Sequence, residues 1–120
     1  MRISCSDSDI KIAAKKINDG KIVIFPTDTV YGIGCDPYNE ETIQLLYKIK
    51  KRKKIKPFPV IGYSKIELEK IAEFNILEEK IAEKFWPGQV TMILKVRDEK
   101  IRKSLCLDKK IAVRVPNNQC

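Results

Sequence analysis

Apolar residues recur along the chain with two periods, one typical of helices and one typical of strands. Between Ile10 and Ile17 they lie three or four positions apart, which predicts a helix that ends at Gly20. The β-branched run Lys21–Phe25 follows and predicts a short buried strand, which Pro26 ends.

The alternation of helical and strand patterns continues toward the carboxyl end. Asn39 is a suitable cap for a helix that carries apolar positions from Ile43 to Tyr47 and ends in a basic run. Ser64 and Glu67 form a capping-box pattern for another helix. Further strands are predicted at residues 60–63, 90–96 and 111–115, helices at 64–71 and 77–85, and a loop at 26–38, while residues 97–108 form a polar segment. Because strands and helices alternate, the predicted fold class is α/β.

The composition indicates one globular domain. Apolar residues make up 43% of the chain and charged residues 33%, and 120 residues suit a single domain. The apolar runs are far shorter than the ~18 residues of a membrane span. Asp7 and Asp9 stand where a secretory signal would have an apolar core. The sequence therefore predicts a cytoplasmic protein with no membrane partner.

Cysteine spacing and the missing histidine limit the chemistry. The cysteines lie far apart and form no Cys-x-x-Cys pair: Cys5, Cys35, Cys106 and Cys120. We therefore expect four reduced thiols and no metal site. The chain contains no histidine, which excludes a Ser-His or Cys-His nucleophile pair within it. Any chemistry depends on Lys, Arg, carboxylates, hydroxyls and bound ions.

A polar loop at the exit of the first predicted strand is one candidate site. It carries two hydroxyls, a carboxylate, a phenol and a glycine that allows close approach of the backbone: Thr27, Thr29, Asp28, Tyr31 and Gly32. Such a loop can offer side-chain oxygens and backbone amides to a small polar ligand. The alternative is a turn in which Thr and Asp satisfy local backbone groups.

A basic segment is the second candidate. The net charge is +8, and seven of the nine residues from Lys48 to Lys56 are basic. Within it, Lys50, Arg52 and Lys56 offer point charges and one planar guanidinium, which suit a triphosphate or an RNA backbone. The alternative is a solvated basic loop.

Two further segments carry residues of interest. Trp86 is more often a core anchor than a platform for stacking a base. Arg114 lies within an apolar strand, where burial without a partner is costly. It therefore either faces an edge of the sheet or holds an anion.

Taken in order, these segments resemble the successive motifs of the YrdC-like family. The motifs are Pro-Thr-Asp-Thr-Val-Tyr-Gly-Ile-Gly at residues 26–34, Lys50-x-Arg52 with Lys56-Pro57, Trp86-Pro87-Gly88-x-x-Thr91, and Val113-Arg114-Val115-Pro116. The resemblance spans residues 8–117. It implies one domain over residues 1–120, with a twisted mixed sheet and flanking helices around a basic cleft.

The resemblance also implies an activity. Members of the synthase branch are nucleotidyltransferases that form threonylcarbamoyl-AMP and pyrophosphate from L-threonine, bicarbonate or CO2, and ATP. Their product feeds t6A modification of tRNA, so the t6A transferase machinery is an expected partner. Mg²⁺ is expected to arrive with the nucleotide, held by phosphates and water.

Carried over by position, the resemblance assigns two sides to the site. Lys50 and Arg52 are expected to be catalytic. The residues expected to contact L-threonine are Thr27, Thr29, Tyr31, Lys95 and Arg114, and those expected to contact ATP are Lys50, Arg52, Lys56 and Thr91. In such a reaction the protein mainly aligns anions and neutralises charge, which needs no histidine.

The sequence departs from the family pattern at two places. Ile61 stands where the family often has a threonine-contacting histidine, and no Ser-x-Asn motif, which contacts ATP in the family, follows Pro116. We therefore expect a domain truncated at its carboxyl end. One alternative function is a non-catalytic domain that binds double-stranded RNA or tRNA, since a basic cleft suits an RNA backbone. Another is a carbamoyl-handling domain of the type found in hydrogenase maturation proteins, which usually comes with extra domains.

Overall fold

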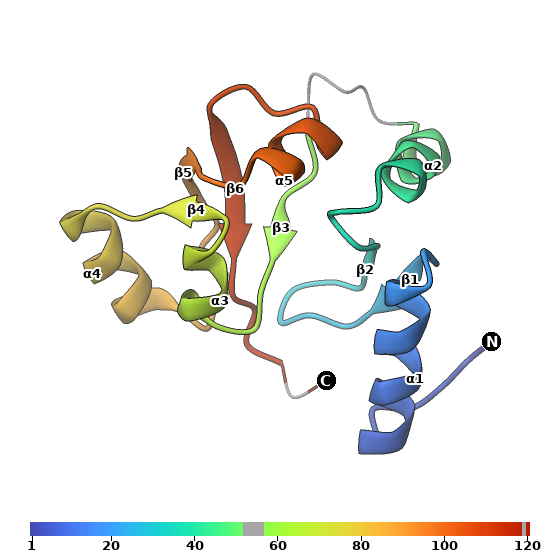
Figure 1. The fold of residues 1–120 in the computed structure, drawn as a ribbon. Helices are drawn as coiled ribbons and strands as arrows, with labels where there is room; N and C mark the ends of the chain where they lie inside the picture. The colour runs from blue at the N-terminus through green and yellow to red at the C-terminus, as the bar shows by residue number, and fades with distance from the viewer. Residues whose placement is uncertain (52–56, 119) are drawn as a thin grey trace.

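The computed structural model describes residues 1–51, 57–118 and 120 (Figure 1). Its helices are α1 (Asp7–Asn18), α2 (Glu40–Lys50), α3 (Lys65–Glu69), α4 (Ile76–Phe85) and α5 (Glu99–Ser104). Its strands are β1 (Val23–Phe25), β2 (Gly32–Gly34), β3 (Val60–Ile61), β4 (Ala72–Glu73), β5 (Met92–Val96) and β6 (Lys110–Arg114). The α/β fold class, with a mixed sheet and flanking helices, is confirmed.

The strands form two sheets. The larger sheet has the order β3-β6-β5-β4, in which β3 runs parallel to β6 and the other neighbours are antiparallel. The smaller sheet is the antiparallel pair β1-β2. Figure 1 shows this pair beside α1 and α2, facing the open side of β3. The loop that joins β1 to β2 extends toward the larger sheet (Figure 1).

The larger sheet is buried on one face only. Along β5, Met92 and Leu94 are 7% and 1% exposed, whereas Ile93 between them is 66% exposed. This alternation follows from the two-residue period of a strand. The buried face packs against α2 and α5, whose residues Ile43 and Ile101 are each 1% exposed. The other face, which carries Ile93, is exposed.

Side-chain caps set where the helices begin. α1, α2, α3, α4 and α5 are capped by Ser6, Asn39, Ser64, Asn75 and Asp98, each accepting hydrogen bonds from backbone N–H groups of the first turn. The predictions for α1, α2 and α4 are confirmed within one or two residues. In the predicted capping box before α3, Ser64 accepts from the Glu67 N–H at 3.2 Å.

Several local predictions were wrong. The strand Lys21–Phe25 was predicted to be buried, but Ile24 is 69% exposed because β1 pairs only with β2 in a two-stranded sheet. The loop predicted at 26–38 contains β2, and the polar segment at 97–108, for which no helix was predicted, contains α5. The helix predicted at 64–71 ends at Glu69, just before β4. Each of these elements is short, so its pattern covers less than the window that makes periodicity readable.

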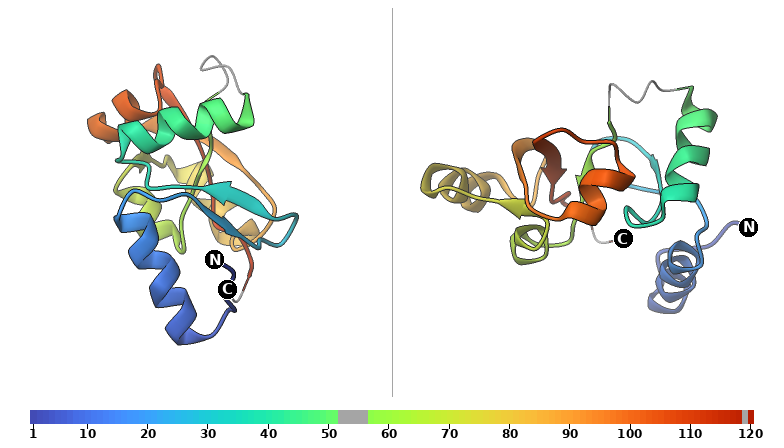
Figure 2. Two further views of the ribbon diagram at one scale, coloured as in Figure 1. Left: turned by 90° about the vertical axis from the view of Figure 1, so that its right-hand side faces the viewer. Right: turned by 45° about the horizontal axis from the view of Figure 1, so that its top comes forward.

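The prediction of four reduced thiols is wrong for two cysteines. Cys5 and Cys120 form a disulfide across 115 residues, while Cys35 and Cys106 are free. Sequence spacing gave no sign of the pair because it arises from the fold, in which the segment before α1 passes the carboxyl end (Figure 2, left view) and the two Cα atoms are 5.3 Å apart. Within the described ranges, none of the helices has the length and apolar character needed to cross a membrane.

Candidate functional site

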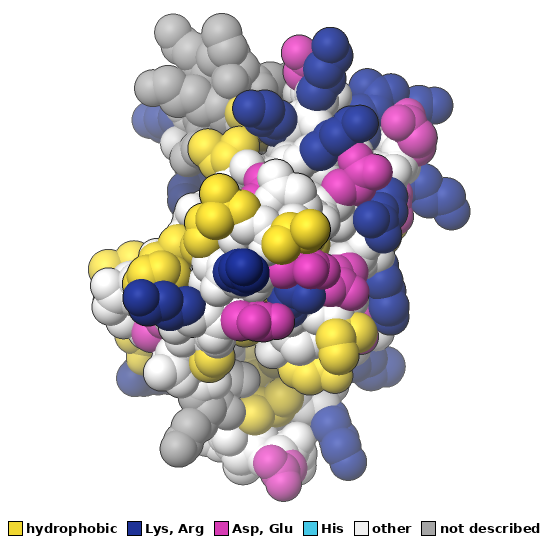
Figure 3. Space-filling model, turned by 90° about the vertical axis from the view of Figure 1, so that its left-hand side faces the viewer, with side chains coloured by type: hydrophobic (Ala, Val, Ile, Leu, Met, Phe, Trp, Pro, Cys, Tyr) yellow, Lys and Arg dark blue, Asp and Glu magenta, His cyan; other side chains and the backbone are white. Residues whose placement is uncertain are grey.

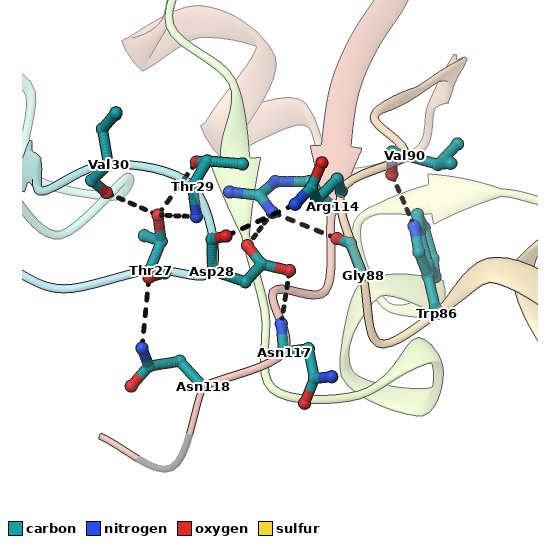
Figure 4. A network of polar contacts seen from close by, with 11 residues as sticks. Thr27, Asp28, Thr29, Val30, Trp86, Gly88, Val90, Arg114, Asn117 and Asn118 are labelled. Carbon is teal, nitrogen blue, oxygen red and sulfur yellow. Dashed lines mark hydrogen bonds and ion pairs between the residues drawn. The ribbon is translucent and has the colours of Figure 1, made fainter.

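The loop between β1 and β2 is attached to the larger sheet by a part-buried ion pair. Asp28 accepts a hydrogen bond at Oδ1 from Nη1 of Arg114, the last residue of β6 (Figure 4). Each side chain is 12% exposed. The other carboxylate oxygen accepts from the backbone N–H of Asn117 at 2.9 Å. Arg114 Nη1 also donates to the carbonyl oxygen of Gly88 at 3.0 Å.

This arrangement answers the question that the sequence left open for Arg114. β6 is a central strand, so Arg114 does not face an edge, and the anion that it holds is Asp28. The Asn117 N–H, followed by the Arg114 guanidinium, lowers the pKa of Asp28 below its ordinary 3.8. A charge pair that is largely removed from water is tolerable when its buried polar atoms have partners, and no buried side-chain nitrogen or oxygen atom among the described residues lacks one.

The hydroxyls of Thr27 and Thr29 lie side by side at the tip of the loop. Their Oγ1 atoms are 3.1 Å apart. The Thr27 hydroxyl donates to the Val30 carbonyl oxygen at 2.5 Å and accepts from the Thr29 N–H at 3.2 Å. Thr27 is thus used in the local turn, in agreement with the alternative reading of this loop. Thr29 is exposed, so its hydroxyl is accessible to a ligand.

Glycines allow the strand after the loop to pack closely. A Cβ atom on Gly32 would lie 3.1 Å from the ring of Phe25, and one on Gly34 would lie 3.0 Å from it. The ring therefore packs directly on β2 at these two glycines, and a larger residue at either position would have to displace it. Pro26 follows β1, so the loop begins directly beyond this packed pair. The glycines are explained by this packing.

The turn after α4 forms the other side of the site. Trp86 donates from Nε1 to the Val90 carbonyl at 2.7 Å and packs edge-on against Phe74, with centroids 5.9 Å apart. Gly88 donates its N–H to the Val115 carbonyl at 2.8 Å. A Cβ on Gly88 would lie 2.4 Å from the Phe85 carbonyl oxygen. Trp86 is therefore a packing anchor that holds Gly88 against the end of β6.

The residues predicted to contact L-threonine, and Thr91 predicted to contact ATP, do not all lie in one place. Thr91 lies one position before Met92, which pairs with Val113, so it stands at the same end of the sheet as Arg114. Lys95 pairs with Lys110 at the opposite end and forms an exposed ion pair with Glu73 at 3.5 Å. Tyr31 is 75% exposed.

The structure therefore brings Thr27 and Thr29 together with Arg114 through Asp28, and Thr91 stands at the same end of the sheet as Arg114. It leaves Lys95 apart from them.

Of the residues predicted to contact the ATP phosphates, the structure describes Lys50. Lys50 is the last residue of α2, is exposed, and has its Nζ 5.9 Å from the ring centroid of Phe58. Phe58 in turn packs against Tyr47, with ring centroids 4.3 Å apart. The predicted residues Arg52 and Lys56 lie outside the described residues, so their roles stay predictions.

Sequence reasoning gave three contributors no role in holding the site together, although it named Asp28 in the polar loop and Gly88 in a family motif. Asp28, Gly88 and Asn117 hold the loop and the end of β6 together. The sequence indicated the need for a partner only at Arg114, because a charge within an apolar strand requires an anion. The partner is 86 positions away in sequence, so its identity could not be read from spacing.

The described residues of the site coincide with no metal cluster, and a surface hollow near Tyr38 lies apart from them. Among the described residues, no group of three or more Cys, Asp or Glu side chains could hold a metal ion. A hollow of about 300 Å³ lies between Tyr38 and Tyr63, and none of the predicted site residues that the structure describes lines it. The candidate site is thus an open surface at the end of β6.

Comparison with known proteins identifies what the chain is similar to. The Sua5_yciO_yrdC family model, described as "Telomere recombination", matches residues 15–120. A Pyrococcus abyssi protein named threonylcarbamoyl-AMP synthase is 38% identical over 86 residues, covering 71% of this chain and 25% of that protein. A Methanocaldococcus jannaschii protein, given the same name provisionally, is 44% identical over 86 residues, covering 72% of this chain and 42% of that protein.

Solved structures agree over nearly the whole chain. The crystal structure of P. abyssi Sua5 complexed with L-threonine superposes with a TM-score of 0.87 and 33% identity, covering 99% of this chain and 35% of that one. Escherichia coli YciO matches in fold, with a TM-score of 0.84 and 24% identity over 94% of this chain and 55% of its own. The chain spans less than half the length of the two relatives named above.

Proposed function

The chain belongs to the Sua5/YciO/YrdC family, and on that premise we propose that it is an L-threonylcarbamoyladenylate synthase. The proposed reaction converts L-threonine, bicarbonate or CO2, and ATP to threonylcarbamoyl-AMP and pyrophosphate. Relatives with the name of this enzyme support the proposal, as does the superposition on a relative complexed with L-threonine. Because the chain spans only part of these relatives, the activity is proposed for the site that it does contain.

One observation carries the proposal. The loop with Thr27 and Thr29 is fixed to the end of β6 by the Asp28–Arg114 pair, with the accessible hydroxyl of Thr29 at its tip. A loop that served only as a turn needs no part-buried ion pair, because its local hydrogen bonds satisfy it. A fixed array of oxygens and amides is instead what orientation of a small zwitterion requires.

The proposed chemistry needs alignment and charge neutralisation. The amine of L-threonine adds to the carbon of CO2 and loses a proton, giving a carbamate. A carbamate oxygen then attacks the α-phosphorus of ATP, and the bond to the bridging oxygen of pyrophosphate breaks. Lys50, with Arg52 and Lys56, would neutralise the phosphates and the leaving group, and Mg²⁺ would arrive as part of the nucleotide substrate.

The residues around the proposed threonine site have two kinds of role: some would contact L-threonine and others shape the loop. Thr29 and Tyr31 are exposed and would contact L-threonine, while Thr27 shapes the turn. Thr91 would face the nucleotide from the same end of the sheet. Arg114 has Nη1 committed to Asp28 and Gly88, so contact with threonine would use its other donors. The adenylate would pass to the t6A transferase machinery for transfer to tRNA.

Binding of double-stranded RNA or tRNA without catalysis is the second candidate. The net charge of +8 and the basic run from Lys48 to Lys56 favour it. On the side of α4 and β4, Lys and Arg side chains are interspersed with Asp and Glu (Figure 3). Binding of an RNA backbone would therefore depend mainly on the basic run.

Pyrophosphate release tests the proposal. We expect release from ATP only when L-threonine and bicarbonate are both present, and its loss in Lys50→Ala. Lys84→Ala is a matched control, because Lys84 is an exposed lysine near the end of α4. If release does not depend on threonine and Lys50→Ala instead weakens salt-sensitive RNA binding, the RNA-binding function replaces the synthase.

A further inference from the structure

We propose that Asp28 is a positioning residue, which fixes the loop of residues 27–31 so that its ligand-facing groups are held ready for L-threonine. This inference rests on the proposed function for the identity of the ligand. It concerns a residue that touches neither substrate in the proposed site. Asp28 acts through the groups that it holds.

Both oxygens of the Asp28 carboxylate accept hydrogen bonds, one from β6 and one from the residues that follow it. Oδ1 accepts from Arg114 on β6, and Oδ2 accepts from the N–H of Asn117 beyond that strand at 2.9 Å. These partners lie 86 and 89 positions from Asp28 in the sequence. Asp28 therefore joins the smaller sheet's loop to the end of the larger sheet.

The other contacts of the loop are weaker or local. Gln89 Nε2 donates to the Asp28 carbonyl at 3.4 Å, and Asn118 Nδ2 donates to the Thr27 carbonyl at 3.2 Å, both in exposed positions. The hydrogen bonds between Thr27, Thr29 and Val30 stay within the turn. They set the shape of the turn but not its position against β6. Its placement therefore depends on the carboxylate of Asp28.

The pair also sets the role of Arg114. A guanidinium that is 12% exposed and paired with Asp28 does not present an unpaired charge to the carboxylate of threonine. Its Nη1 bridges Asp28 to the Gly88 carbonyl, which places the loop beside the turn that Trp86 anchors. Hydrogen bonds that involve charged groups are stronger than neutral ones, so this bridge is suited to hold a loop in place.

Asp28→Asn tests the proposal because it removes the charge while keeping the size of the side chain. We expect the amides of residues 29–31 to exchange with solvent about tenfold faster, since local opening becomes easier. We also expect the dissociation constant for L-threonine to rise about tenfold, with the KM for ATP within about twofold. Glu99→Gln is the matched control: it removes an exposed carboxylate from the Arg102 pair, away from the site, and should change neither quantity.

The double variant Asp28→Asn with Arg114→Gln covers the case in which the single variant fails to fold, since it leaves no unpaired guanidinium. It should fold and still show fast exchange in the loop. Unchanged loop exchange, or faster exchange spread evenly over the whole chain, would overturn the positioning role. If the unaltered protein binds no L-threonine but the loop responds as expected, the proposed function fails while the fixing of the loop by Asp28 stands.

Discussion

The phenol of Tyr38 donates a hydrogen bond to the carboxylate of Asp98 at 3.0 Å, across 60 positions of sequence. Asp98 is the N-cap of α5, and Tyr38 lies just before α2. Beside them, the Ser104 hydroxyl donates to the Pro37 carbonyl at 2.5 Å. The segment between β1 and α2 is therefore held against the rest of the fold at two places. One is at α5, through these two hydrogen bonds, and the other is at the end of β6, through Asp28.

Removal of the Tyr38 hydroxyl should weaken this second attachment. Tyr38→Phe is expected to lower the free energy of unfolding by about 0.5–1.5 kcal/mol, the net value of one such hydrogen bond. Urea denaturation measures it. Tyr31→Phe is the matched control, because Tyr31 is 75% exposed and has no hydrogen bond among the described residues. Equal effects of the two changes would contradict the attachment.

The Asp28 pair should depend on pH in the acid range. Since the folded-state pKa of Asp28 lies below its ordinary 3.8, its contribution to stability is present above that value and is lost as pH falls below it. The stability difference between the unaltered protein and Asp28→Asn should therefore shrink between neutral pH and about pH 2.5. Denaturation of both proteins across this range measures the difference. A difference that stays constant would show that the carboxylate charge is not involved.

Counting thiols tests the disulfide. Without reductant, the unfolded chain should expose two reactive thiols, Cys35 and Cys106, and after reduction it should expose four. In the folded protein Cys106 should react first, since it is exposed, while burial raises the pKa of the Cys35 thiol. Mass spectrometry after alkylation gives the counts. Four thiols without reductant would support the prediction from sequence instead.

The two faces of the larger sheet should respond differently to truncation. Leu94→Ala should lower the free energy of unfolding by about 2.7–5 kcal/mol, because its side chain is 1% exposed and a cavity would remain. The neighbouring change Ile93→Ala should stay within about 0.5 kcal/mol, because that side chain is 66% exposed. Denaturant titration compares them. Similar losses would mean that something covers the open face.

Features that depend on neighbouring residues, such as helix caps and strand ends, were predicted from the sequence. Asn39 and Ser64 were predicted to cap helices and do so, and Pro26 ends β1. β2 was missed because its two glycines read as a turn, whereas pairing with β1 and packing under Phe25 make it a strand. Tertiary contacts of this kind override the local pattern.

The family motifs named candidate residues but not the connections between them. Thr27, Thr29 and Arg114 were named, and the structure brings them to one network. Asp28 was read only as part of a polar loop, because its pairing with Arg114 depends on how the two sheets meet. Lys95 was grouped with Arg114, but the register of β5 and β6 places it at the other end of the sheet.

Binding of L-threonine measured by amide chemical shifts tests the central claim most directly. The account predicts that L-threonine shifts the backbone amides of residues 27–32, that L-valine, which has the same shape without the hydroxyl, binds at least about tenfold more weakly, and that Thr29→Val reduces this preference. Shifts confined to other parts of the chain, or equal binding of the two amino acids, would contradict it.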